Sequence, residues 1–398
     1  AKGNPVIFTN GDNDTFPLWY NQETEGVRTD ARVCNLSYLQ TDWYIDQMRR
    51  PAYDSPSLPI SWTRLQYVTG TREGIPVQPD ALQQVIDYYK DSPEDLKQML
   101  GDNPYELKNI IRHWVLNDNP DLQIFPTDSI VVTVDKEAVK RSGMMIAADS
   151  IPDVMHISLK GKRAVYKSEM MMLEMISQAN WERPLYMPTT VGPDNYGHLG
   201  DNFVQEGLAC RITPFDTKQS GRTIDSERMY NNMMNKFKYG GLKENPDIYL
   251  DETVIRMCYT HRRLFNQLAQ QLLKEGQKDK ALKVLQRAEE EIPGSIVPHE
   301  AFYGHSLELA DAWLALGHKA EAEKLLNAVG QNAKEYIEWY LSLNTQRLLQ
   351  SSRECLMQIY ILNDIAKTWE PIDKKKAETY RMEVNNYASR CHQRGMSL

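Results

Sequence analysis

The sequence predicts an α/β domain with a Rossmann-like, largely parallel sheet and a helical insertion, followed by an all-α, tetratricopeptide-like helical domain. Short apolar segments alternate with amphipathic segments in the first part, and polar turns separate them. After Asp251 only amphipathic helix patterns appear, and small residues recur in them. We place the α/β domain at residues 1–235, its insertion near 79–118 and the helical domain at 245–398.

The first strand, loop and helix give the α/β domain its predicted starting unit. Val6, Ile7 and Phe8 are β-forming, and the turn formers of Asn10–Asp14 follow them. Helical spacing then begins at Thr15, with Pro17 expected in the first turn. The polar loop therefore lies at the carboxyl end of a strand, which is the edge where open α/β sheets bind ligands.

This loop and a second polar loop provide the candidate binding residues, Asp12, Asn13, Asp14, Asp194 and Asn195. One interpretation is that Asp12 and Asp14 hold a sugar hydroxyl or a divalent cation. The other is that Asp12, Asn13 and Asp14 close the turn and cap the helix, which accounts for all three residue types. We assign no catalytic residue, no metal site and no cofactor beyond that cation, since neither nucleotide-binding glycine patterns nor paired metal-ligand spacings occur.

Further segments complete the predicted α/β domain. Strands are expected at 31–36, 62–69, 129–135, 154–159, 185–187 and 205–212. A long helix is expected over 164–180, and its methionines are interpreted as core rather than as a binding surface. The polar, glycine-containing stretch 220–246 then marks the domain boundary, between Asp216 and Asp251.

The helical domain contains two copies of a small-residue pattern typical of tetratricopeptide repeats. The matching positions are Ala269, Gly276, Ala281, Leu285, Ala288 and Pro293 in one copy and Ala310, Gly317, Ala322 and Leu326 in the other. They predict antiparallel helix hairpins over 264–293 and 306–329. Such arrays bind peptides or partner proteins in a concave face, while the alternative is that these helices only support the α/β domain.

Composition and charge limit the classes of function. A formal charge of −8 argues against nucleic acid as a partner. No apolar run is long enough to span a bilayer, and the abrupt start leads us to expect a piece of a longer protein. The five cysteines lack zinc-type spacing; Cys34 and Cys210 are interpreted as buried, and a Cys355–Cys391 disulfide is one possibility.

Several stretches resemble one membrane-protein family. They are Phe8–Tyr20 (FTNGDNDTFPLWY), Glu25–Asp30 (EGVRTD), Arg32-Val33, Asn35–Ser37 (NLS), and, more weakly, Asn180–Tyr186 (NWERPLY) and Glu206–Arg211 (EGLACR). Together they are similar to the extracytoplasmic C-terminal part of a bacterial multi-spanning family, domain-of-unknown-function family twenty-seven twenty-three, related to the animal plexin-type protein O-mannosyltransferases. The similarity covers about the first 215 residues.

The resemblance implies a preceding membrane half with the glycosyltransferase C-type fold and a lipid-linked sugar donor. In such folds the catalytic acid lies between membrane helices, so the resemblance places no catalytic residue in this chain. It implies a periplasmic location at the inner membrane, with the missing membrane half and a protein or glycan acceptor as partners.

Three functions follow as hypotheses. The first is an accessory acceptor-binding or partner-binding domain of a glycosyltransferase-like membrane protein, not catalytic alone. The second is an interaction scaffold that uses the repeats, and the third is a metal-dependent nucleotide-sugar transferase using Asp12 and Asp14. The third is disfavoured because no nucleotide-binding glycine pattern accompanies these residues.

Overall fold

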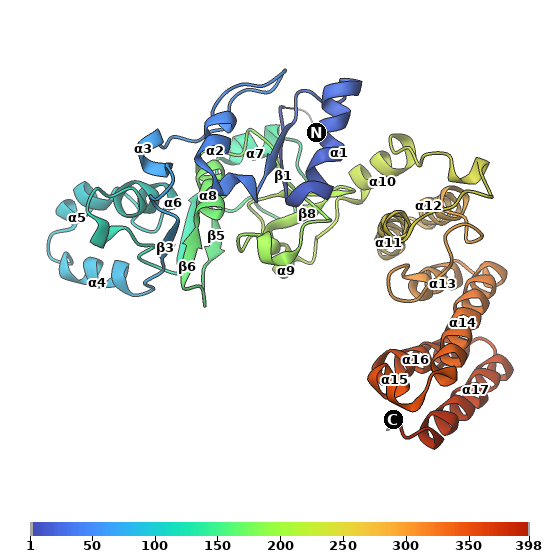
Figure 1. The fold of residues 1–398 in the computed structure, drawn as a ribbon. Helices are drawn as coiled ribbons and strands as arrows, with labels where there is room; N and C mark the ends of the chain where they lie inside the picture. Colours follow the sequence, from blue (N-terminus) through green and yellow to red (C-terminus); the bar gives the residue numbers. More distant parts are fainter. Residues whose placement is uncertain (1–2, 397–398) are drawn as a thin grey trace. The chain divides into compact units, whose positions relative to one another are not determined.

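The structure, a computed structural model, describes residues 3–396 (Figure 1). It divides into two compact units, Ala1–Asp225 and Ser226–Leu398. The first unit is mixed α/β, and the described part of the second is helical. This confirms the predicted order of the two fold classes.

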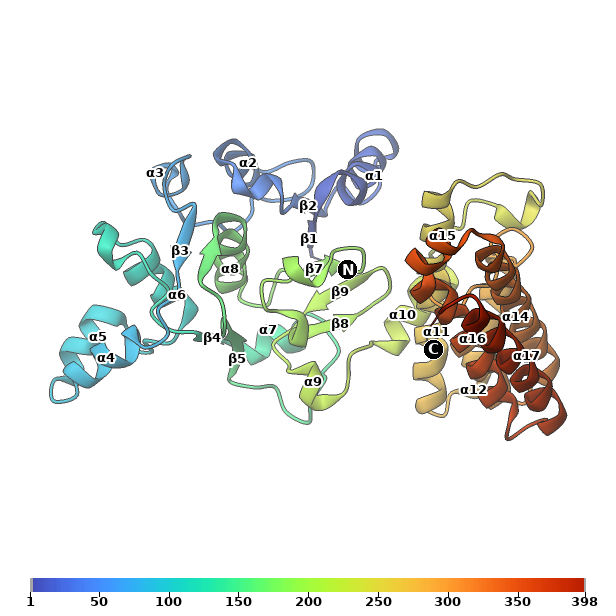
Figure 2. The ribbon, with the colours of Figure 1, turned by 60° about the horizontal axis from the view of Figure 1, so that its bottom comes forward.

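The main sheet of the first unit has five strands in the order β2-β1-β7-β9-β8. These strands are β1 (Val6–Thr9), β2 (Arg32–Asn35), β7 (Leu185–Pro188), β8 (Phe203–Gln205) and β9 (Ala209–Ile212). β1 pairs in parallel with both β2 and β7, whereas β9 pairs antiparallel with β7 and β8 (Figure 2). The sheet is therefore mixed, and the prediction of a largely parallel sheet is wrong for its β9–β8 side.

A turn inside the segment 205–212 explains this difference. The sequence predicts one strand there, but Glu206, Gly207 and Leu208 separate β8 from β9. Gly207 has φ 140°, a backbone conformation that residues with a side chain rarely adopt. Because two strands joined by such a short turn must run antiparallel, the glycine reverses the chain at the end of the sheet.

Three further segments that the sequence predicts as strands do not join the main sheet. β4 (Ser129–Thr133) and β5 (Val154–Ser158) pair with each other as a separate two-stranded antiparallel sheet. The predicted strand at 62–69 is instead α3 (Arg64–Tyr67), whose N-cap Thr63 forms a capping box with Gln66. Satisfying the free N–H groups at the helix start outweighs the β propensity of these residues.

The remaining elements of the first unit are mostly short helices. They are α1 (Gly11–Glu25), η1 (Tyr38–Gln40), α2 (Asp42–Met48), α4 (Ala81–Tyr88), α5 (Pro93–Leu100), α6 (Leu107–Ile110), α7 (Lys136–Arg141), α8 (Lys167–Ala179), η4 (Pro193–Asn195), η5 (Gly200–Asn202) and α9 (Thr217–Ser220). β3 (Gly74–Pro76) pairs antiparallel with β6 (Ala164–Tyr166). The predicted helical insertion is present as α4 to α6, and a π-helical turn, Ile111–Val115, extends α6.

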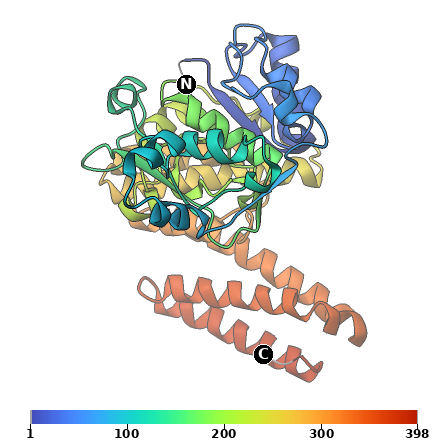
Figure 3. The same ribbon diagram turned by 90° about the vertical axis from the view of Figure 1, so that its left-hand side faces the viewer.

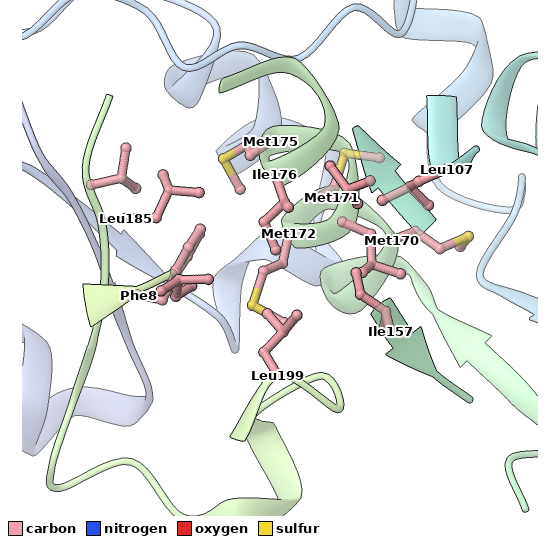
Figure 4. Close-up of a cluster of buried hydrophobic side chains, with 14 of the residues drawn as sticks. Phe8, Leu107, Ile157, Met170, Met171, Met172, Met175, Ile176, Leu185 and Leu199 are labelled. Atoms are coloured by element: carbon pink, nitrogen blue, oxygen red, sulfur yellow. The ribbon is translucent and has the colours of Figure 1, made fainter. Parts of the chain in front are cut away.

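Helix α8 supplies much of the hydrophobic core. Met170, Met171 and Met172 are all at most 1% exposed, which confirms that the methionines are core residues. Figure 4 shows Met172 beside Leu199 and shows Ile176 on the side of Phe8 of β1. The next residue of β1, Thr9, bonds to α1, so the two helices cover opposite faces of this strand.

The second unit consists of α-helices and one short 3₁₀ turn in its described part. The helices are α10 (Ser226–Asn235), α11 (Glu252–Lys274), α12 (Lys278–Glu291), α13 (Ser306–Ala315), α14 (Lys319–Ser342), α15 (Thr345–Gln350), α16 (Ser352–Trp369) and α17 (Lys374–Gln393). η6 (Leu242–Glu244) is the short turn. The two predicted helix pairs are α11–α12 and α13–α14, joined by short turns at Gly276 and Gly317. Ala269, Ala281, Ala310 and Ala322 are fully buried.

Ala281 is expected to tolerate no larger side chain, because it has no exposed surface on α12. Ala281→Leu should lower the free energy of unfolding by about 1–3 kcal/mol through overpacking. Ala320→Leu on α14 is the matched control, since Ala320 is exposed and leucine is also a good helix former. Urea unfolding of both variants measures the difference; equal stability of the two would contradict close packing at Ala281.

Cys355 and Cys391 are buried with their Sγ atoms 3.9 Å apart, on α16 and α17, which run side by side (Figure 3). All five cysteines are free thiols. Burial raises the pKa of the Cys355 thiol to about 12, so little reactive thiolate is present at neutral pH.

A thiol oxidant such as diamide should therefore join Cys355 to Cys391 slowly at about pH 7 and faster as the pH rises. The disulfide should raise the melting temperature because it restricts the unfolded chain. Free-thiol titration and thermal melts check both expectations, with Cys391→Ser as the control that should not respond. If Cys355 and Cys391 both remain free thiols after treatment with the oxidant at about pH 9, the expected reaction does not occur.

Candidate functional site

Three parallel strands place their following loops at one edge of the main sheet. β1 ends at Thr9, β2 at Asn35 and β7 at Pro188, and β1 pairs with the other two. From β1 the chain passes through α1 to β2 on one side, while β7 lies on the other side. The edge between β1 and β7 is therefore a topological switch point, the usual ligand-binding position in sheets of this kind.

The side chain of Asn35 organises this edge. It is fully buried, and its amide Nδ2 donates to Thr15 Oγ1 at 2.9 Å and to the Gly11 carbonyl at 3.3 Å. Its Oδ1 accepts from the backbone N–H groups of Ser37 at 2.8 Å and Tyr38 at 3.2 Å. One amide thus joins the end of β2 to the start of α1, and Asn35 is the residue on which the edge depends.

The predicted site residues Asp12, Asn13 and Asp14 lie at this edge, but within a helix rather than a loop. α1 begins at Gly11, and Asn10 occupies the N-cap position without a side-chain capping bond. The expectation that Asn13 or Asp14 caps the helix is therefore wrong. The two aspartates lie in the first turn, where negative charge stabilises the helix N-terminus.

Pro17 is also displaced from its predicted place. It lies inside α1 rather than in the first turn, because the helix starts earlier than the sequence predicts. Proline has no N–H, so Pro17 cannot donate the usual helical bond to the Asn13 carbonyl four residues earlier. This carbonyl is therefore left for another donor at the exposed end of the helix.

Asp12 and Asn13 are exposed, and Asp14 is half-buried. Asp12 Oδ1 accepts a hydrogen bond of 3.2 Å from the Tyr38 hydroxyl. Partial burial, followed by the nearby Asp12 carboxylate, raises the pKa of Tyr38, which keeps that phenol protonated as a donor. The edge thus presents carboxylate and amide oxygens to solvent, a set suited to hydroxyl groups of a ligand.

The second pair of predicted residues, Asp194 and Asn195, lies in η4, on the loop that follows β7. Gly197 fixes this loop on the core: its φ is 56°, and an added Cβ would lie 2.2 Å from Met172 Cε. The loop therefore fits closely over α8. Parallel pairing of β1 and β7 brings this loop and the start of α1 to the same edge, yet no hydrogen bond or ion pair between residues 12–14 and 194–195 occurs in the described chain.

A cavity of the first unit lies elsewhere and was not predicted. It has a volume of about 800 Å³ and is lined by β5, the preceding loop and the segment 198–222. His156, His198, Asp201 and Arg222 are among its polar groups. These residues are far apart in the sequence and follow no motif spacing, so the sequence offered no signal for them.

Within residues 3–396, no group of three or more His, Cys, Asp or Glu side chains is arranged to hold a metal ion. In the same range, no helix is both long and apolar enough to cross a membrane.

Arg183 and Glu206, in the two weaker motifs of the resemblance, have structural roles. Arg183 donates to the backbone carbonyls of Asn4 at 2.7 Å and Ser57 at 2.8 Å, and burial lowers the pKa of its guanidinium to about 10. Glu206 is buried beside Arg211 and accepts a hydrogen bond of 2.8 Å from the Tyr186 hydroxyl. Arg183 and Glu206 therefore connect β7 to its neighbours in the structure.

Residues 1–232 match the family model described as TMEM260-associated domain 2. The match covers more than half of the chain, so the chain belongs to this family, which is connected to glycosyltransferase-like membrane proteins. The match does not test the resemblance to domain-of-unknown-function family twenty-seven twenty-three or the bacterial origin that this resemblance implies. Neither the curated proteins nor the solved structures contain a match.

Among the polar side chains of this edge, Asn35 should contribute most to the free energy of unfolding. Asn35→Ala leaves buried partners without hydrogen bonds and should lower the free energy of unfolding by about 2–4 kcal/mol. Ser37→Ala, at an exposed position in the same loop, should change it by less than about 1 kcal/mol. Chemical denaturation measures both; a loss for Asn35→Ala no larger than that of the control would contradict the role assigned to the amide.

Proposed function

We propose that this chain is the extracytoplasmic, periplasmic part of a membrane-embedded glycosyltransferase-like protein and that its α/β unit forms the acceptor side of the site. The observation that carries the proposal is the family match over residues 1–232. Residues of the motifs that carry the resemblance, from Asn10 to Thr15 and from Asn35 to Ser37, lie together at the carboxyl edge of the sheet. In Rossmann-like sheets this is the edge that binds ligands.

The chemistry of the edge favours an acceptor over an activated donor. Sugar transfer needs a carboxylate within about 3 Å of the acceptor hydroxyl as a general base. It also needs a metal ion or basic side chains for the phosphate leaving group. Helix α1 carries Asp12 and Asp14 but contains neither lysine nor arginine. The edge is therefore suited to hold hydroxyl groups, while the phosphate of a lipid-linked donor would be bound by the membrane half.

The helical unit fits the role of a partner-holding segment. Its α11–α12 and α13–α14 hairpins have the buried alanines expected of tetratricopeptide-like packing. On α14, Asn332, Glu335, Tyr336 and Trp339 line a hollow of about 380 Å³, and Tyr336 and Trp339 are about half exposed. Aromatic side chains of this kind are frequent anchors in protein interfaces. This supports the scaffold function as a second candidate for residues 226–398.

The purified chain should transfer no sugar on its own. Incubation of residues 1–398 with a lipid-phosphate sugar or a nucleotide sugar, with peptide and glycan acceptors present, should give no product by mass spectrometry. The physical reason is that the edge lacks a basic phosphate-binding helix start. Turnover that Asp12→Asn or Asp14→Asn abolishes would overturn the accessory role.

In the membrane-embedded protein, Asp12→Asn combined with Asp14→Asn should raise the KM for the acceptor severalfold while the KM for the donor stays unchanged. The change removes two negative charges from the start of α1, where the acceptor hydroxyls are expected to bind. Asp91→Asn, an exposed carboxylate in the helical insertion, is the matched control. An effect on the donor KM alone would assign the edge to the donor instead.

A further inference from the structure

Four aromatic side chains form a continuous row beside the acidic start of α1. Phe16 and Trp19 come from α1, Tyr38 from η1 and Trp43 from α2. Neighbouring ring centres lie 5.7 Å apart for Phe16–Trp19, 6.4 Å for Trp19–Tyr38 and 5.9 Å for Tyr38–Trp43. We call these four residues the aromatic ledge.

The ledge is both anchored and open to solvent. Trp19 and Tyr38 are partly buried and pack against the main hydrophobic core, which fixes their positions. Phe16 is 47% exposed and Trp43 is 50% exposed. Several large aromatic side chains that remain exposed next to one another are a typical feature of a binding surface.

The surrounding charge restricts what the ledge can bind. Helices α1 and α2 contain six acidic residues, Asp12, Asp14, Glu23, Glu25, Asp42 and Asp46, and no lysine or arginine. Arg64 of α3 pairs with Asp42 and Asp46, and Arg49 and Arg50 follow α2, so the uncompensated acidic charge lies on α1. Surfaces that bind anionic lipids or phosphate groups carry basic residues around their aromatic side chains. The charge therefore disfavours a membrane surface, a nucleotide or a phosphorylated ligand at this position.

The orientation of the rings distinguishes the remaining ligands. The ring planes of Phe16 and Trp19 differ by 25°, as do those of Trp19 and Tyr38. A cage for an organic cation needs rings that face a common centre from several sides. Stacked rings face one another, and the planes of Tyr38 and Trp43 are tilted by 46°, so the free aromatic surface lies on the exposed Phe16 and Trp43 at the two ends of the row. An exposed aromatic ring of this kind is a surface on which the face of a pyranose ring can pack.

Polar groups along the ledge match the hydroxyl groups of a sugar. Asn13, Ser37 and Gln40 are exposed beside it, and amides and hydroxyls both donate and accept hydrogen bonds. The C–H groups of a pyranose face are weakly positive and pack on the negative face of an aromatic ring. A neutral sugar can thus use the rings and the polar margin together.

We propose that the aromatic ledge binds a neutral hexopyranose unit of a glycan, stacked on its aromatic rings and hydrogen-bonded to its polar margin. The biological role of this glycan, as part of the acceptor, rests on the proposed function. Binding itself is a property of the chain described here and is tested without any transfer reaction.

The test is saturation-transfer NMR and calorimetry of residues 1–398 with cellohexaose, maltohexaose and an α-linked mannohexaose. We expect at least one of these neutral oligosaccharides to bind, and Trp43→Ala and Phe16→Ala each to weaken binding by about tenfold or more. Trp43→Phe, which keeps an aromatic face, should retain most of the affinity. Tyr88→Ala is the matched control, because Tyr88 is 81% exposed and its ring lies T-shaped against Tyr89, as the Trp43 ring lies against Tyr44.

Two further probes distinguish sugar binding from binding of a membrane or a cationic peptide. Vesicles of phosphatidylglycerol and phosphatidylethanolamine and a lysine-rich peptide are titrated in parallel. Absence of binding to all three oligosaccharides, or binding that Trp43→Ala and Phe16→Ala leave unchanged, overturns the proposal, as does ledge-dependent binding of the vesicles or the peptide alone. Thermal melts confirm that the variants are folded. Sugar binding by the chain with no acceptor effect in the membrane protein would support the ledge and contradict the proposed function.

Discussion

The buried amide of Asn35 is the interaction on which the functional edge depends. β1 and β2 end beside each other, and the chain then turns in different directions, into α1 after β1 and into η1 after β2. A buried end of two strands leaves backbone groups that need partners. Asn35 supplies two donor bonds to the start of α1 and two acceptor sites to the loop after β2. Asn35 therefore connects the acidic start of α1 to the backbone of the loop that carries Tyr38.

The sequence predicted the features that local chemistry decides. The strand at Val6, the methionine core of α8 and the helix pairs of the second unit follow from apolar periodicity, and the structure has them. The segment 62–69 is predicted as a strand from its β-forming residues, but part of it folds as α3 because Thr63 and Gln66 form a capping box. Two local preferences compete in this segment, and β propensity alone does not decide between them.

Other features depend on pairing between distant segments, which a single sequence does not contain. The apolar alternation of Ser129–Thr133 predicts a strand, but not that its partner is Val154–Ser158 rather than the main sheet. The candidate residues Asp12 and Asp14 were found because they follow a strand. The aromatic ledge was not, since Trp43 and Phe16 come together only through Tyr38, which belongs to a different element. Sites assembled from three elements in this way become visible only in the folded chain.

The contact between Gly197 and Met172 links the loop after β7 to the interior. Gly197 has φ 56°, where a residue with a side chain is strained whatever space surrounds it, while the Met172 Cε that an added Cβ would meet is the end of a flexible side chain. The backbone conformation, more than the space around it, therefore requires glycine at this position. An engineer who wished to alter ligand preference at this edge would have to keep Gly197 and change the exposed residues of the loop around it.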